Sequence, residues 1–173
     1  LLHHEGLYYP LGLGPHGLVS EALLLHMKSP AIHGALNMIY RYGITEDEAY
    51  AQKVYPYLRG VADFWEKDLV CRDGVYHVVG DGMHERTDGN IRDNGVPEDP
   101  VNTLGYLKTF FTWMPRISEA LDLDEKKREK WLEIAENLAP YPKGTIREIQ
   151  ENPTLWKEVD VKLEASSQIQ EYL

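Results

Sequence analysis

The chain has 173 residues, which is enough for one hydrophobic core and close to the size of a single domain. Its formal net charge of -10 and isoelectric point near 5.1 disfavour binding to the phosphate backbone of nucleic acid. No apolar run approaches the roughly 20 residues that cross a bilayer, so we expect no membrane partner.

Cys71 is the only cysteine, which excludes an internal disulfide and a cysteine-based zinc site. The seven histidines are scattered and show no H-E-x-x-H spacing, so we predict neither a metal nor a cofactor. The chain starts at Leu1 without an initiator methionine. We therefore expect residues 1–173 to form a single partial domain.

Apolar residues at helical spacing predict a first helix from Leu18 and a second from Pro30. Ser29 is a capping residue before a proline at the first helical position, and the apolar stripe of this second helix includes Tyr40 and ends at Gly43.

The segment Thr45–Glu48 fits the capping-box pattern, in which a threonine and a glutamate satisfy the exposed amides of a first turn. The helix that it opens is expected to run to about Val70, with a kink at Pro56.

A turn at Asp73 and Gly74 is followed by the β-branched and aromatic run Val75–Val79, which predicts a minor β-hairpin near residues 70–80. The segment Gly80–Asp99 has no periodicity, and structureless loops of that length are usually functional or disordered.

Two more helices are expected, one opening with Asp99 as cap before Pro100, and one opening at Asp122–Glu125 and stopping at Pro140. Residues 145–173 show no clear amphipathic periodicity, and we expect them to form a C-terminal extension of uncertain structure. The chain as a whole is predicted to be all-α.

Two consecutive runs, Tyr40–Tyr50 and Val54–Trp65, resemble the six-hairpin (α/α)6 glycosidases, and are closest to glycoside hydrolase family 95, the inverting α-L-fucosidases and α-galactosidases. The stretch Leu104–Leu138 looks like the hairpin that follows in that family, and the resemblance covers about residues 31–144. It implies an all-α fold that is part of an (α/α)6 toroid. It also implies glycoside hydrolase activity and a periplasmic or secreted location.

The family carries its general acid in a Ser-Pro-Glu-Asn turn after a short hairpin, and Met83–Arg86 occupies that turn here. The resemblance therefore implies that Glu85 is the catalytic acid. The alternative is that Glu85 is a solvated loop glutamate, because an unpaired glutamate is normally exposed.

Inverting hydrolysis needs a second carboxylate as base, roughly 6.5–9.5 Å from the acid. Asp81, Glu98 and Asp99 are the candidates near Glu85, although Asp99 is better explained as a helix cap. The carboxylate and asparagines that activate water in the family lie in segments with no match in this sequence. We expect the base to lie outside this chain.

Three residues are predicted to bind the sugar substrate. His84 is placed to donate a hydrogen bond to a sugar hydroxyl or to tune the acid, and Asp81 is a further polar contact. Trp113 offers a flat apolar face to a sugar ring, whereas Trp65 and Trp131 are assigned to packing because of their helical spacing.

The sequence thus predicts a fragment of the catalytic domain of an inverting glycoside hydrolase. Its expected partners are an oligosaccharide or glycoside substrate and the rest of its own (α/α)6 domain. The alternative from another class is a non-catalytic helical domain that binds sugar or has a structural role. A third reading is a phosphorylase or lyase on the same toroid.

Overall fold

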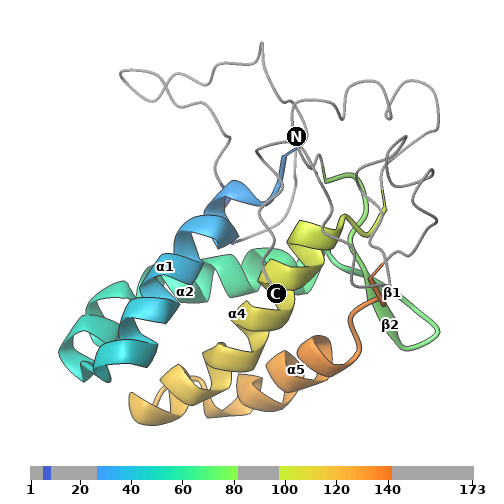
Figure 1. The fold of residues 1–173 in the computed structure, drawn as a ribbon. Helices are drawn as coiled ribbons and strands as arrows, with labels where there is room; N and C mark the ends of the chain where they lie inside the picture. Colours follow the sequence, from blue (N-terminus) through green and yellow to red (C-terminus); the bar gives the residue numbers. More distant parts are fainter. Residues whose placement is uncertain (1–5, 9–26, 82–97, 142–173) are drawn as a thin grey trace, which may run out of the picture.

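The computed structural model describes residues 6–8, 27–81 and 98–141 (Figure 1). The elements in chain order are α1 (Pro30–Thr45), α2 (Glu48–Asp68), β1 (Val70–Arg72), β2 (Val75–His77), α4 (Val101–Ala120) and α5 (Glu125–Glu136). The prediction of a mainly helical chain with a minor hairpin near residues 70–80 is confirmed for these residues. The helix expected from Leu18 and the extension at 145–173 lie outside them.

Helix α4 is the central element of the described fold. It packs against α1, α2 and α5, and α1 also packs against α2. Figure 1 shows two helical pairs, α1 with α2 and α4 with α5, and places the small sheet beside the C-terminal end of α5. None of these helices has the length and apolar character needed to span a membrane.

The apolar stripe predicted for α4 forms the centre of the core. All six of its members are buried: Leu104, Leu107, Phe110, Phe111, Met114 and Ile117. Phe110 and Phe111 meet edge to face, with ring centroids 5.3 Å apart and an interplanar angle of 85°, a favourable aromatic arrangement. Trp65 and Trp131 are both 0% exposed, so their assignment to packing is confirmed.

Helix α1 departs from its prediction in three details. It ends at Thr45, two residues beyond the expected Gly43. Ser29 occupies the capping position, but its side chain makes no capping bond. Tyr40, expected on the buried stripe, is 43% exposed, because it lies about 100° around the helix from the fully buried Ile39.

The capping box predicted at Thr45–Glu48 is wrong. Thr45 closes α1, and its hydroxyl donates to the Arg41 carbonyl at 2.9 Å. Asp47 caps α2 instead, and its carboxylate accepts from the Tyr50 amide at 3.0 Å. Since α1 runs through Gly43, the helix boundary falls two residues later than the motif suggested.

The hairpin joins α2 to the second helical pair. β1 and β2 are antiparallel, and the turn residues Asp73 and Gly74 both have positive φ, 51° and 83°, as a tight hairpin turn requires. On its other edge β2 is tied to the exit of α5. The Tyr76 amide donates to the Asn137 carbonyl at 2.8 Å, and the Ala139 amide donates to the Tyr76 carbonyl at 2.9 Å.

Helix α5 is linked to α2 by charged side chains. Arg59 Nε lies 3.0 Å from an Asp124 oxygen, and Lys127 Nζ lies 2.9 Å from Glu66, which also accepts from the Trp131 indole at 2.7 Å. Asp124 is the N-cap residue of α5, but its side chain makes no capping bond. Its carboxylate instead accepts hydrogen bonds from Tyr55 and Arg59 of α2.

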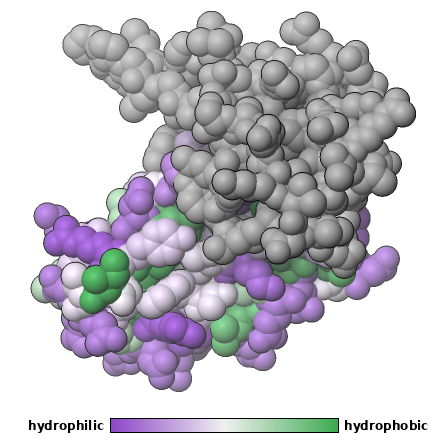
Figure 2. Space-filling model, viewed as in Figure 1, coloured by the Kyte–Doolittle hydropathy of each residue, from purple (hydrophilic) through white to green (hydrophobic). Residues whose placement is uncertain are grey.

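Polar residues cover most of the visible surface of these helices. Figure 2 shows hydrophobic residues there as small separate areas among hydrophilic ones. Six large apolar side chains are exposed in the described part: Tyr8, Tyr40, Ile44, Val70, Leu123 and Leu132. Ile44, at 84%, is the most exposed of them.

Replacing Phe110 with alanine should lower the free energy of unfolding by about 3–5 kcal/mol, because a fully buried aromatic ring leaves a cavity at the centre of α4. Urea denaturation measures the loss. The matched control is Lys126→Ala on the exposed side of α5, which should stay within about 0.5 kcal/mol of the parent. Similar losses in both variants would contradict the placement of α4 at the centre of the core.

Candidate functional site

Asp81 is the one acidic or basic residue that is fully buried among the described residues, at 0% exposure. Its Oδ1 accepts from the Lys28 backbone amide at 2.5 Å, and its Oδ2 accepts from the Thr103 hydroxyl at 2.6 Å. Lys28 leads into α1, and Thr103 lies in the first turn of α4. Asp81 therefore joins two helix starts to the chain that leaves the hairpin.

The Lys28 side chain adds a second set of bonds at the same place. Its ammonium lies 2.9 Å from both Asp68 oxygens at the end of α2, and it donates to the Val79 carbonyl at 2.8 Å. An ammonium has three donor hydrogens, which these acceptors use. The cluster of Lys28, Asp68, Asp81 and Thr103 thus ties together the ends of three helices.

Burial has a marked effect on the ionisation of Asp81. Loss of solvent raises the pKa of its carboxyl to about 6, against the lowering effect of the Thr103 and Lys28 bonds and of the Lys28 charge. The Asp68 charge adds to the rise. The pKa of the Tyr8 hydroxyl is raised as well, by its own burial and then by the charges of Asp81 and Asp68. Asp81 can therefore exchange a proton not far from neutral pH.

Asp99 fixes the chain just before α4 to the end of the hairpin. Its Oδ1 accepts from the Val78 amide at 2.8 Å, its Oδ2 lies 2.7 Å from His77 Nδ1, and its own amide donates to the Val78 carbonyl at 2.8 Å. The backbone of Asp99 is left-handed, with φ of 51°, which aspartate tolerates better than most residues. Backbone and side-chain hydrogen bonds therefore hold Asp99 against Val78.

The structure corrects the role predicted for Asp99 as a helix cap. The residue before α4 is Pro100, whose side chain cannot cap, and the Asp99 carboxylate bonds the hairpin strand instead of the helix amides. Glu98 bridges Val79 through the backbone and pairs with Arg72 at 3.0 Å, with both side chains nearly half exposed. Both candidate bases therefore have partners on the hairpin.

The predicted site residues are only partly brought together. Glu85 and His84 lie outside the described residues. Asp81 lies in the buried cluster at the start of α4. Trp113 lies ten residues beyond Thr103, about 15 Å further along the helix. There it packs over Gly43 of α1, where an added Cβ would come within 2.8 Å of the indole ring.

Sequence analysis missed Lys28 and Thr103, the two residues that bond Asp81. Neither is part of a local motif, because they lie 53 and 22 residues away along the chain. A weak signal existed: Thr103 is a polar residue on the stripe that otherwise holds Leu104 and Leu107, and it is fully buried. A buried hydroxyl needs a partner, and Asp81 is that partner.

The role that this arrangement supports is anchoring of the chain that leaves the hairpin. No group of three or more His, Cys, Asp or Glu side chains in the described part is placed to hold a metal ion. Comparison of the chain with protein-family models and with curated proteins finds no match.

Changing Asp81 to asparagine should alter the pH dependence of stability. The folded-state pKa of Asp81, about 6, lies above its ordinary value, so the folded form binds the proton more tightly and is destabilised when the carboxyl ionises. Relative to Asp81→Asn, the parent should lose stability as pH rises from about 4 to about 7, by up to roughly 3 kcal/mol. Denaturation midpoints of both proteins across this range measure the difference. A difference that stays constant with pH would contradict a raised pKa.

Asp99→Ala should cost about 2–3 kcal/mol of unfolding free energy, because it leaves the buried Val78 amide without an acceptor and puts alanine into a left-handed backbone. Asp99→Asn keeps an acceptor oxygen and tolerates that backbone, so it should cost less than about 1 kcal/mol. Urea denaturation of the two variants at neutral pH provides the comparison. Equal losses would mean that the Asp99 charge, and not the bond to Val78, is what matters.

Proposed function

We propose that this chain is part of the catalytic domain of an inverting glycoside hydrolase with an (α/α)6 toroid, and that Glu85 is its general acid. Two helical pairs joined through a short hairpin support the toroid. A complete toroid needs further helical hairpins, so the remainder of the same domain is proposed as a partner. The substrate is proposed to be an oligosaccharide or glycoside.

The observation that carries this proposal is the anchoring of the chain on both sides of Glu85. Asp81, four residues before it, is bonded to the starts of α1 and α4. Asp99, fourteen residues after it, is bonded to the end of the hairpin. An acid must be held in a fixed geometry relative to the leaving oxygen, and sites supported by packed helices and a bonded second layer meet that need.

The base of an inverting mechanism is proposed to come from outside this chain. Each of the three candidate carboxylates already has an internal partner: Asp81 accepts from Lys28 and Thr103, Glu98 pairs with Arg72, and Asp99 bonds Val78 and His77. A base must instead be free to accept a proton from water.

A second candidate function is a non-catalytic helical domain that binds sugar or packs against a neighbour. The same internal pairing of Asp81, Glu98 and Asp99 favours it, because carboxylates committed to structural bonds are not available for chemistry. Turnover separates the two candidates: a sugar-binding domain would retain affinity for glycosides without releasing a reducing sugar.

The decisive test is Glu85→Gln in the full-length protein that contains this chain, assayed on fucosides and galactosides. Loss of the transferable proton should lower turnover by about 10²–10⁴-fold on substrates with poor leaving groups. An activated aryl glycoside needs little protonation and should be affected far less. Initial rates on a matched pair of substrates measure this asymmetry.

Glu98→Gln is the control from the same segment, because Glu98 is exposed and paired with Arg72. It should leave both rates nearly unchanged. Equal slowing of both substrates by Glu85→Gln would assign Glu85 a structural role. A full-length protein that hydrolyses neither class of glycoside would count against the proposal and in favour of the binding domain.

A further inference from the structure

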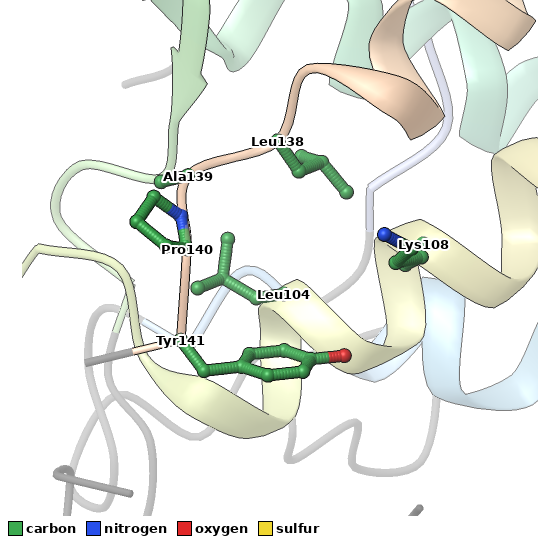
Figure 3. A pocket seen from close by; sticks show the side chains of 6 residues that line it. All are labelled: Leu104, Lys108, Leu138, Ala139, Pro140 and Tyr141. Atoms are coloured by element: carbon green, nitrogen blue, oxygen red, sulfur yellow. The ribbon is translucent and has the colours of Figure 1, made fainter. Parts of the chain in front are cut away.

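A small cavity lies between α4 and the segment that follows α5. Its described lining comes from Leu104 and Lys108 on α4 and from residues 138–141 beyond α5 (Figure 3). Figure 3 shows Leu138 and Tyr141 extending from that segment toward the turn of α4 that bears Lys108. The lining therefore combines apolar side chains, an aromatic ring and the solvent-exposed Lys108.

Two polar groups of this cavity have no hydrogen-bond or ion-pair partner among the described residues. They are the Lys108 ammonium and the Tyr141 hydroxyl. Five other cations of the described part are paired with carboxylates: Lys28, Arg59, Arg72, Lys127 and Lys130. Burial raises the pKa of the Tyr141 hydroxyl, which therefore stays protonated and able to donate at neutral pH.

The size of the cavity limits what it can hold. It encloses about 120 Å³. An apolar cavity of about 150 Å³ accommodates one benzene molecule, so this smaller, partly open one holds at most a single six-membered ring and not a chain of rings. Leu104, Leu138 and Ala139 favour a ring with an apolar face, and the phenol of Tyr141 provides a flat surface for it.

The positive charge of Lys108 favours a negatively charged ligand. The chain carries a net charge of -10, which disfavours anions in general, but repulsion from charges more than roughly 8–10 Å away is largely screened in physiological salt. The Lys108 ammonium then acts locally, and a carboxylate forms a strong charge-assisted hydrogen bond with it. Tyr141 supplies a second donor.

We propose that this cavity binds a single six-membered ring that carries a carboxylate, with the ring against Tyr141 and Leu138 and the carboxylate at Lys108. Two ligand sources share this chemistry, aryl carboxylates and uronic acids. The described lining includes no member of the buried Asp81 cluster. Ligand binding at this cavity can therefore be tested independently of glycoside hydrolysis.

The test is binding of 4-fluorobenzoate to the full-length protein, followed by fluorine NMR, with methyl glucuronide followed by saturation-transfer NMR as the second arm. Neutral partners of the same shape, 4-fluorobenzyl alcohol and methyl glucoside, serve as ligand controls. We expect millimolar binding of at least one acid and about fivefold or greater weakening of each neutral partner relative to its acid. The arm that binds more tightly identifies the source.

Lys108→Met keeps the apolar stem and removes the charge, and it should weaken binding of the acid about fivefold. Lys126→Met makes the same change at an exposed site on α5 and should have no effect. Tyr141→Phe keeps the ring and should bind more tightly than Tyr141→Ser. Absence of binding by both acids at about 10 mM, or equal effects of the two lysine variants, would overturn the proposal.

Discussion

Burial of the apolar stripe of α4 is the constraint on which the rest of the structure depends. The stripe contacts α1, α2 and α5, so each of the other helices covers a part of it. Close packing of aromatic and branched side chains around Phe110 leaves little freedom in how the two helical pairs are arranged. The ends of the helices, where polar groups gather, are positioned as a result.

The buried carboxylate of Asp81 connects this core to the part of the chain proposed to be functional. Thr103 sits on the buried side of α4, so its hydroxyl presents a fixed donor to Asp81. A buried polar network stabilises the fold most when every member has a hydrogen-bond partner. Both Asp81 oxygens have one. The same burial that builds the helical core therefore holds Asp81, four residues before Glu85 in the sequence.

The elements that sequence predicted well are those with a local physical cause. Helical periodicity located α2 and α4, and the Asp73 and Gly74 turn located the hairpin. Helix caps were less predictable, because Thr45 and Asp99 both have capping chemistry but bond elsewhere. The residues that bond Asp81 could not be predicted from the sequence. It depends on tertiary packing that brings residue 28 to residue 81, and no local pattern encodes such a distance.

The ladder around Tyr76 has a consequence for how the chain folds during synthesis. Strand β2 pairs on one side with the adjacent β1 and on the other with residues 137–139, about sixty residues later. A ribosome adds roughly 5–20 residues each second, so the second edge of β2 has no partner for several seconds after the strand itself is made. An unpaired strand edge invites association with other chains. The second edge of β2 is thus satisfied only once residues 137–139 have emerged.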